Sequence, residues 1–338
     1  MKSTIFDVAQ RAGVSIKTVS RVVNREPNVR DVTRERVERA IDELNYRPDQ
    51  SARNLASHRS HLIGLVYDDP AAYELPSSGY IINMQQGALR ACRSAMHELL
   101  IHPCDFRRKN VGNELRAVIT DARLSGVILA APLSNMSRIV RAVQATNTPF
   151  VRLSPGRRLR NQPCVVTDDQ QSCQKMTEYL AGLGHTRIAF VRGNQDHAAV
   201  SNRELGYKDG LQASGLKFRR SLIADGDNSF ASGEQCAAKL LNRKQPPTAI
   251  FAANDDMAAG VIRTAARMGI SVPHELSVAG FDDITLARQL DPTLTTIRQP
   301  LASMAEKAVA MLTGDSEQYL CVPASLQIRE STGKAPAT

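Results

Sequence analysis

The chain has 338 residues, of which 42% are hydrophobic and 23% charged, so its composition is that of a globular protein with two or three domains. It contains no run of about eighteen apolar residues, which excludes a membrane-spanning helix, and its polar start lacks the apolar core of a secretory signal, which predicts a cytoplasmic protein. The six cysteines form no C-x-x-C pair, which argues against a zinc site and a disulfide framework.

The net charge of +9 is unevenly distributed along the chain. Residues 1–60 carry twelve Lys or Arg against eight Asp or Glu, so the first sixty residues are several times more basic, per residue, than the rest. A basic terminal region on a nearly neutral body is typical of a protein that binds nucleic acid. Charge alone leaves the alternative of a merely basic surface open.

Two short helices are predicted at the start of the chain. Thr4 is a good N-cap with an acidic residue three positions later, and Gly13 ends the first helix. Ser15 caps a second helix that runs to about Asn24. The apolar stripe of the first helix recurs at i, i+3, i+4 and i+7, at Ile5, Val8, Ala9 and Ala12.

A third helix is predicted from Thr33, with an apolar stripe that ends at Leu44 and packs across the first two helices. Two helices joined by a short glycine-containing turn form a helix-turn-helix, whose second helix enters the major groove of DNA. Lys17 and Arg21 would then reach base edges and phosphates. The alternative is a three-helix bundle with a solvated charged face.

The run TIFDVAQRAGVSIKTVSRVVN, from Thr4 to Asn24, resembles the DNA-binding domain of the lactose-repressor (LacI/GalR) family of bacterial transcriptional regulators. The resemblance implies that Ile16, Lys17 and Arg21 read operator bases. An apolar residue such as Ile16 suits a thymine methyl group. The resemblance gives a second set of residues a role in fixing phosphates or capping the helices: Thr4, Ser15, Thr18, Ser20 and Asn24.

Residues 48–60 are predicted to be an interdomain segment. Pro48 ends the third helix, and Leu55 stands alone among small and polar neighbours, so a flexible linker is one interpretation. The family resemblance implies instead a hinge helix that orders on DNA, with Leu55 wedged into a base step of the minor groove. Ala52 would allow the partner helix to approach closely, and Arg53 would contact phosphate.

From residue 61 onward, short apolar runs alternate with helical patterns, which predicts parallel sheets covered by helices on both faces. The runs predicted as strands are LIGLVY, LLIHPC, GVILAAP, PFVRLS, RIAFVRG, TAIFAAN and ELSVAGFDD. We expect an all-α helix-turn-helix domain (1–47) followed by an α/β domain (61–338) of two doubly wound subdomains. This body resembles the type I periplasmic-binding-protein fold. The expected subdomains are 61–163 with 293–321, and 164–292 with 322–332.

The sequence shows no catalytic, nucleotide or metal motif: no G-x-x-x-x-G-K-[ST], no G-x-G-x-x-G, no H-E-x-x-H and no G-x-S-x-G. We therefore expect no enzyme activity, no cofactor and no metal. Adjacent residues on a strand point to opposite faces, so Asp68 and Asp69 are interpreted as polar groups at a strand end on the rim of the cleft. They are not expected to act as an acid–base pair.

Three polar clusters follow predicted strands, and in parallel sheets they converge on one cleft. Arg203, Asn254 and Asp282 would together suit a neutral polyhydroxylated ligand. The alternative is a structural Arg–Asp pair with a helix-capping Asn. The stretches GFDD and DPTLTTIRQP also resemble the family, and the resemblance, which covers about residues 3–332, implies that these three residues touch the effector.

The loop YDDPAAYELPSSGYI departs from the family pattern. Tyr67, Tyr73 and Tyr80 are candidates for the pocket wall there. The chain has no Trp to stack on a sugar ring, so Phe190, Phe230 or Phe281 would replace it. The predicted effector-binding set is Tyr67, Tyr80, Arg203, Asn254, Phe281 and Asp282.

These features predict a homodimeric repressor of carbohydrate-utilisation genes that binds a near-palindromic operator and is controlled by a small sugar or sugar derivative. A nucleobase or another non-sugar metabolite acting as co-repressor remains the alternative. An enzyme with a DNA-binding module, such as a sugar kinase, would need a phosphate-cradling loop. A transport protein would need a signal peptide. The final residues show no heptad pattern, which argues against a tetramerisation coiled coil.

Overall fold

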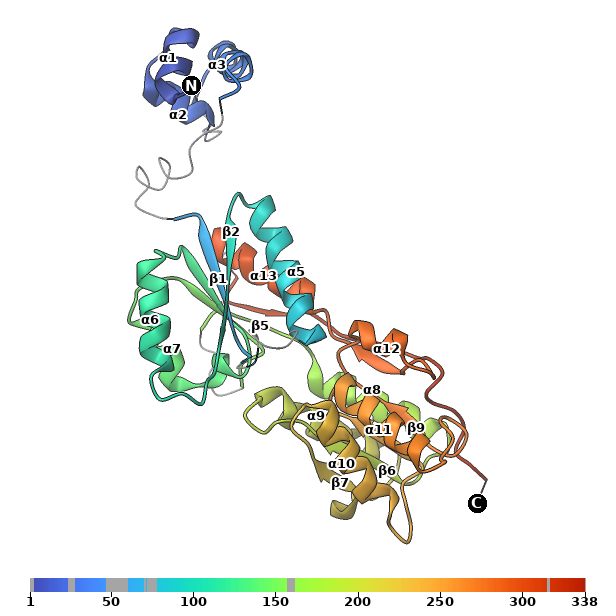
Figure 1. The fold of residues 1–338 in the computed structure, drawn as a ribbon. Helices are drawn as coiled ribbons and strands as arrows, with labels where there is room; N and C mark the ends of the chain where they lie inside the picture. Colours follow the sequence, from blue (N-terminus) through green and yellow to red (C-terminus); the bar gives the residue numbers. More distant parts are fainter. Residues whose placement is uncertain are drawn as a thin grey trace. The chain divides into compact units, whose positions relative to one another are not determined.

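The computed structural model describes residues 3–23, 28–46, 60–69, 71, 78–156, 162–314 and 317–337. The chain divides into two compact units, Met1–Ser60 and His61–Thr338. Each unit has its own hydrophobic core. The helices and strands of both units are labelled in Figure 1.

The first unit is a three-helix domain. Its helices are α1 (Ile5–Ala12), α2 (Ile16–Val23) and α3 (Asp31–Glu43). The core is built by small and β-branched side chains: Val8, Ala9, Ala12, Val19, Val22, Val37 and Ala40. α3 begins two residues before the predicted Thr33. Asn24, the predicted end of the second helix, lies outside the described residues.

The second unit consists of two lobes, each built on a parallel sheet. The first lobe has six strands in the order β11-β5-β4-β3-β1-β2. They are β1 (Leu62–Asp68), β2 (Glu98–Cys104), β3 (Gly126–Leu129), β4 (Phe150–Leu153), β5 (Cys164–Val166) and β11 (Tyr319–Cys321). All of the pairs in this sheet are parallel, so the carboxyl ends of its strands meet at one edge.

Helices cover both faces of the first sheet, because successive side chains of a strand point to opposite faces. Leu65 packs with α5 (Gly79–Ser94) and α13 (Leu301–Thr313), whereas Val66 packs with α6 (Val111–Asp121) and α7 (Ser137–Gln144). A short 3-10 turn, η1 (Leu133–Asn135), joins β3 to α7. The near-continuous apolar runs of the sequence are thus explained by burial on two sides.

The second lobe has a four-stranded sheet in the order β7-β6-β8-β9. Its strands are β6 (Ile188–Arg192), β7 (Ile223–Asp225), β8 (Ala249–Ala252) and β9 (Ser277–Ala279). Its helices pack chiefly as two pairs, α8 with α9 and α10 with α11. They are α8 (Asp169–Gly182), α9 (Ala198–Ala213), α10 (Phe230–Leu241) and α11 (Asp255–Arg267), with the shorter η3 (Arg220–Leu222) and α12 (Thr285–Gln289).

Three connections join the lobes, and they correct two predicted boundaries. β5 pairs with β4 and β11 in the first sheet, so the first crossing follows Val166 instead of preceding Cys164. Leu294 and Ile297 lie in the core of the second lobe, so the return to the first lobe follows β10 (Thr296–Arg298) instead of residue 292. The third connection runs from β11 to β12 (Ser325–Gln327), which pairs antiparallel with β10.

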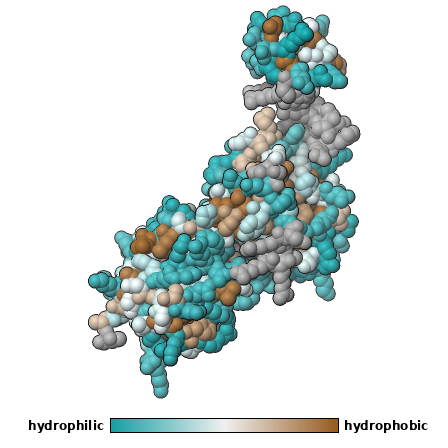
Figure 2. Space-filling view, turned by 180° about the vertical axis from the view of Figure 1, so that it is seen from behind, coloured by the Kyte–Doolittle hydropathy of each residue, from teal (hydrophilic) through white to brown (hydrophobic). Residues whose placement is uncertain are grey.

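Seen from behind, the surface is mostly hydrophilic, with separate hydrophobic spots (Figure 2). In the part of the chain that the structure describes, no helix has the length and apolarity needed to cross a bilayer.

Candidate functional site

The entry into the helix-turn-helix is fixed by local hydrogen bonds. The Thr4 hydroxyl accepts a hydrogen bond from the backbone N–H of Asp7 at 3.4 Å, and the Asp7 carboxylate accepts from the backbone N–H of Thr4 at 2.7 Å. This reciprocal capping box lowers the pKa of Asp7. Gly13 ends α1 with a φ of 62°, a left-handed conformation that glycine adopts without strain. The turn to α2 is therefore set by residues 4–15.

One face of α2 is buried and the other is open. Val19 and Val22 enter the core, while Ile16 is 40% exposed and Lys17 is exposed beside it. Ser20 and Arg21 follow one turn later and are half-buried. This spacing presents a mixed apolar and cationic strip on one side of a rigid helix.

Ser15 begins α2 as a cap. Its hydroxyl accepts a hydrogen bond from the backbone N–H of Thr18 at 3.2 Å and lies 2.9 Å from the Thr18 hydroxyl. The structure therefore gives Thr4, Ser15 and Thr18 capping roles at the helix ends. The other predicted DNA-contact residues, Asn24, Ala52, Arg53 and Leu55, lie outside the described residues.

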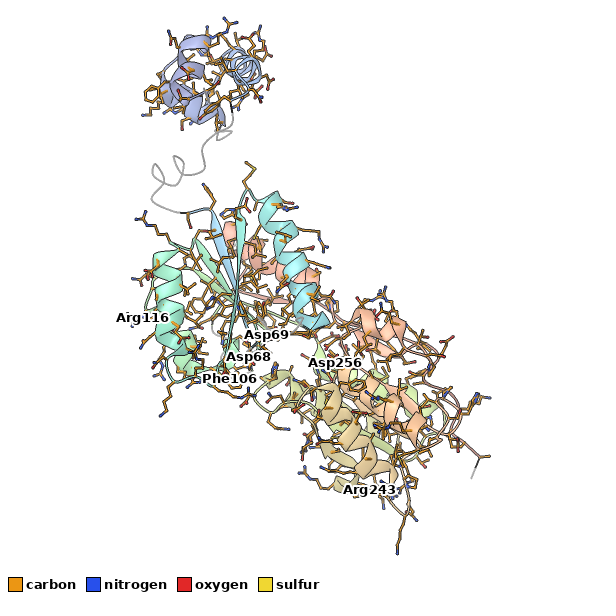
Figure 3. The ribbon with its side chains drawn as sticks, viewed as in Figure 1. Asp68, Asp69, Phe106, Arg116, Arg243 and Asp256 are labelled. Carbon is orange, nitrogen blue, oxygen red and sulfur yellow. The ribbon has the colours of Figure 1, made fainter. Side chains whose placement is uncertain are left out.

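A cavity of about 430 Å³ lies between the two lobes of the second unit. Asp68 and Asp69 reach it from the end of β1, and Asp256 from α11 on the opposite side (Figure 3). The first lobe also contributes Ser78, Tyr80, Ile81, Arg107, Ala131 and Ser154. The second lobe and the connection after β10 contribute Asn194, His197, Ala199, Val200, Arg203, Asp227, Asn228, Ser229, Asn254, Asp282 and Gln299.

Arg203 lines this cavity, and hydrogen bonds hold its guanidinium in place. Its Nε donates to Asp169 at 2.9 Å, its Nη1 donates to the carbonyl oxygen of Ala253 at 2.5 Å, and its Nη2 lies 3.6 Å from Asp282 Oδ1. The ring of Phe281 lies 3.6 Å below the guanidinium. Burial alone would lower the pKa of Arg203, but the two carboxylates outweigh it and raise the pKa. The guanidinium is thus a rigid, permanently charged donor.

Asn254 serves two purposes. Its side-chain oxygen accepts a hydrogen bond from the backbone N–H of Met257 at 3.0 Å and so caps α11, and its Nδ2 donates to the carbonyl oxygen of Asn228 at 2.9 Å. The same residue lines the cavity. The ligand-binding and structural interpretations of the Arg–Asn–Asp set are therefore compatible, because structural bonds hold the side chains at the cavity wall.

Asp282 presents an unsatisfied acceptor. Its carboxylate is buried, and Oδ1 has no hydrogen-bond partner among the described residues. Burial raises the pKa of Asp282 to about 7, against the lowering effect of Arg203. A ligand hydroxyl would supply the missing donor.

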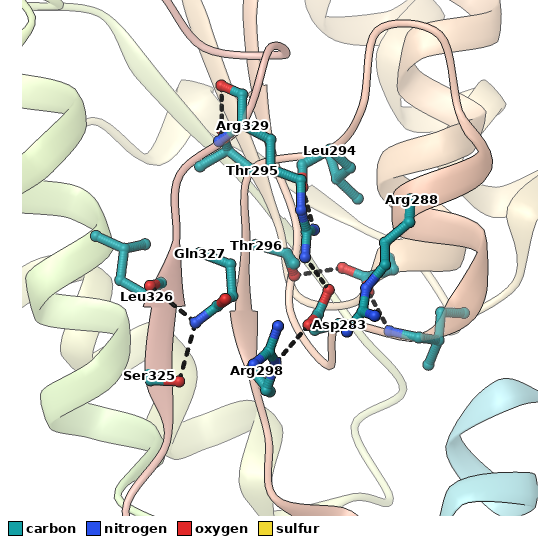
Figure 4. Close-up of polar contacts among 12 residues, drawn as sticks. Asp283, Arg288, Leu294, Thr295, Thr296, Arg298, Ser325, Leu326, Gln327 and Arg329 are labelled. Carbon is teal, nitrogen blue, oxygen red and sulfur yellow. Dashed lines mark hydrogen bonds and ion pairs between the residues drawn. The ribbon is translucent and has the colours of Figure 1, made fainter.

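The neighbouring Asp283 holds the Asp282 loop in place (Figure 4). Its fully buried carboxylate is bound by Arg329 at 2.5 Å, Arg298 at 2.6 Å and Arg288 at 3.1 Å. Burial would raise the pKa of Asp283, but these three hydrogen-bonded guanidiniums lower it below its ordinary value. Both aspartates have positive φ, at 114° and 54°. The anchored carboxylate therefore maintains a backbone conformation that few side chains adopt.

The structure does not bring all of the predicted aromatic residues to the cavity. Tyr67 is buried in the first-lobe core, where its hydroxyl accepts from Gln85 at 3.0 Å. Phe281 lies behind Arg203, and Phe190 stacks on Tyr207 in the second-lobe core. Phe230 is absent from the described lining, and Tyr73 lies outside the described residues. Of the predicted set, Tyr80, Arg203, Asn254 and Asp282 line the cavity.

Several lining residues were not predicted from the sequence. Asn194 and His197 follow β6, and Asp227, Asn228 and Ser229 follow β7, which is too short to give a clear strand pattern. Burial lowers the pKa of His197 to about 4, so its imidazole is neutral at pH 7. The signal that could have found them is the position of polar residues directly after a strand.

In the described part of the chain, no three His, Cys, Asp or Glu side chains come together in a way that could hold a metal ion. The cavity instead offers hydrogen-bonding groups: carboxylates, side-chain amides and two guanidiniums. Such a set binds and orients a small polar molecule.

Comparison with known proteins agrees with this architecture. The family model "Bacterial regulatory proteins, lacI family" matches residues 4–49, and "Periplasmic binding protein-like domain" matches residues 177–332. The regulator DegA of Bacillus subtilis is 32% identical over 98% of both chains. The regulator GalR of Escherichia coli is 32% identical over 91% of this chain and 88% of its own.

Solved structures give the same result. The lac repressor dimer bound to operator and the anti-inducer ONPF has a TM-score of 0.78 and 28% identity, over 98% of this chain and all of that chain. The CelR–cellobiose complex has a TM-score of 0.74 and 28% identity, with the same coverage. The predicted fold class, a helix-turn-helix domain followed by a two-lobed α/β domain, is confirmed. The chain belongs to the lacI family of bacterial regulatory proteins, which are DNA-binding regulators of transcription.

Proposed function

We propose that the chain is a homodimeric repressor of carbohydrate-utilisation genes, whose affinity for a near-palindromic operator is set by a small sugar or sugar derivative in the cleft. The observation that supports this most directly is the pairing, in one chain, of an open helix-turn-helix face with a polar cavity between two lobes. The similar structure of CelR in complex with cellobiose points to the same ligand class.

On DNA, α2 lies in the major groove. Lys17 and Arg21 contact base edges and phosphates, and Ile16 packs against a thymine methyl group. Thr4, Ser15, Thr18, Ser20 and Asn24 fix the helix ends and the phosphate backbone. In the hinge, Leu55 enters the minor groove, Ala52 permits close approach of the partner helix, and Arg53 binds phosphate.

In the cleft, Arg203, Asn254 and Asp282 hold the ligand hydroxyls, and Tyr80 forms the first-lobe wall. Arg203 donates, Asp282 accepts at Oδ1, which has no hydrogen-bond partner among the described residues, and Asn254 stays fixed by its bond to α11. Tyr67 and Phe281 support this wall from behind. A hydroxyl-poor molecule would leave these buried polar groups unpaired, and this rejects it.

Dimerisation is assigned to the open edge of the first sheet. β2 is an edge strand of that sheet, and α5 packs against it (Figure 1). Large apolar side chains are exposed here: Ile82, Leu89, Met96 and Ile101 are between 40% and 66% exposed. An unpaired strand edge flanked by apolar side chains is stabilised by pairing with a second copy.

Regulation follows from closure of the lobes about their three connections. A ligand that binds the closed cleft more tightly shifts the first lobes relative to each other across the dimer, and this favours or disfavours the DNA-bound hinge. A coupling free energy of about 2 kcal/mol would change operator affinity tens of times.

The test is a DNA-binding titration on the duplex upstream of the protein's own gene, at fixed salt, with a panel of sugars. We expect tight binding that one sugar relieves. Arg21→Ala should abolish operator binding but keep sugar binding, and Asp282→Ala should do the opposite. Binding that appears only with an added nucleobase would replace the sugar proposal with co-repression.

A further inference from the structure

A fully buried arginine lies in the first lobe, and none of the described carboxylates pairs with it. Arg152, on β4, is 0% exposed, and its side chain makes one hydrogen bond, from Nη1 to the carbonyl oxygen of Ser134 at 3.3 Å. Its Nε and Nη2 have no partner among the described residues. The residue opposite in the β4–β5 pair is Cys164, and the sequence from Phe150 to Val166 contains no Asp or Glu.

Other residues of the same region also carry unsatisfied polar atoms. Ser154 Oγ, Asn135 Nδ2 and Gln162 Oε1 are also buried without partners in the described structure. Hydrogen bonds place these residues in one region: Asn135 Oδ1 accepts from the N–H of Gly156, two residues beyond Ser154, and the Arg152 N–H donates to the carbonyl oxygen of Pro163, next to Gln162. Five buried atoms therefore lack a hydrogen-bond partner in the described structure. Three of them are N–H donors, the fourth is the Ser154 hydroxyl and the fifth is the acceptor Gln162 Oε1.

Within the described residues, this arrangement is physically incomplete. A buried polar group without a partner is costly, and a buried charge without a counter-charge costs more. An arginine does not escape by losing its proton, because its guanidinium stays charged in proteins. A buried positive charge whose own N–H groups lack acceptors is complemented by an anion.

We propose that Arg152, Asn135 and Ser154 form an anion-binding site in the first lobe, beside the cleft, and that a carboxylate or phosphate group fills it. Ser154 lines the cavity, so the site borders the ligand space. Its φ of 47° marks a left-handed turn directly after β4, of the kind that collects at ligand sites. The anion is either a free ion or the acidic group of the effector.

The first test is thermal unfolding of the full chain in rising inorganic phosphate, at constant ionic strength. Wild type should gain Tm with phosphate, whereas Arg152→Leu should start from a higher Tm in phosphate-free buffer and show no response. Arg116→Leu is the matched control, because Arg116 is exposed on α6, away from the cleft (Figure 3). It should respond as wild type does.

The second test identifies the source of the anion and rests on the proposed function. Calorimetry compares neutral hexoses with their 6-phosphates and uronates. If the effector supplies the anion, the acidic sugar should bind wild type and R116L about tenfold more tightly than its neutral parent, and this preference should vanish in R152L. Equal sugar affinities with an Arg152-dependent phosphate response would identify a free anion.

The proposal is overturned if phosphate raises the Tm of R152L as much as that of wild type. It is also overturned if wild type and R152L differ neither in this Tm response nor in their affinity for acidic sugars. Should R152L fail to fold, Ser154→Ala should weaken the same responses, and an unchanged S154A protein would equally overturn it. If no sugar binds at all, the proposed effector class is wrong, but the phosphate test still decides the anion site.

Discussion

At the scale of single residues, the adjacent carboxylates of Asp282 and Asp283 in the second lobe differ in their pKa. Asp283 stays ionised under three arginines, whereas burial raises the pKa of Asp282 to about 7. Adjacent residues thus differ in role: Asp283 anchors the loop, and Asp282 lines the cavity with an Oδ1 that has no hydrogen-bond partner among the described residues.

This difference predicts a pH effect on stability. An Asp with a folded pKa near 7 and an unfolded pKa near 3.9 binds a proton in the folded state only, so stability falls as pH rises through this window. Asp282→Asn should flatten the fall in the free energy of unfolding between pH 5 and 7, measured with urea. Asp121→Asn, an exposed carboxylate on α6, should leave the wild-type slope. Parallel curves for D282N and wild type would contradict the assignment.

The sequence predicted much of this site, because polar residues after buried strands converge in a parallel sheet. It placed Arg203, Asn254 and Asp282, which the structure brings to one cavity. It could not place Tyr67 correctly, since neighbouring residues of a strand point to opposite sides, so that Tyr67 enters the core while Asp68 lines the cavity. The sequence could not predict that N–H groups of Arg152 lack partners in the described structure, because burial and hydrogen bonding are set by the folded chain.

At the scale of elements, helix pairs pack closely through glycines. A Cβ on Gly87 of α5 would lie 2.1 Å from the backbone oxygen of Ala302 on α13. A Cβ added to Gly206 of α9 or to Gly233 of α10 would lie at a similar distance from a backbone oxygen of the neighbouring helix. The helices therefore approach one another at points where no side chain fits.

Gly87→Ala should destabilise the second unit by about 1–3 kcal/mol, because backbone atoms of α13 cannot yield as a side chain would. The measurement is the free energy of unfolding in urea. Gly182→Ala is the control: it also lies in a helix, but its added methyl meets nothing within 4 Å. That variant should be unchanged or more stable by up to about 1 kcal/mol. Equal losses in both variants would refute the packing argument.

Element prediction succeeded where the hydrophobic pattern is long. The longer apolar runs appear as β1 to β4, β6, β8 and β9. Five three-residue strands were not predicted: β5, β7, β10, β11 and β12. Strands this short carry too few residues for a periodicity, and their partners, distant in sequence, determine them.

At the scale of the whole molecule, the proposed dimer edge predicts a link between assembly and DNA binding. Ile101→Glu, on the exposed edge strand β2, should yield monomers by sedimentation and lower operator affinity about a hundredfold or more, because two half-sites are then no longer bound together. Leu205→Glu on α9 is the control, since it is similarly exposed on the other lobe. A dimeric I101E protein would place the interface elsewhere.

The three connections between the lobes also govern how the chain can fold during synthesis. Residues 1–60 form a unit with local contacts and can fold as soon as they leave the ribosome. The first-lobe sheet is different, because its edge strand β11 spans Tyr319–Cys321 and one of its covering helices spans Leu301–Thr313. The first lobe is therefore not complete until Tyr319–Cys321 have been translated. The nascent regulator thus completes its helix-turn-helix domain before its two-lobed α/β domain.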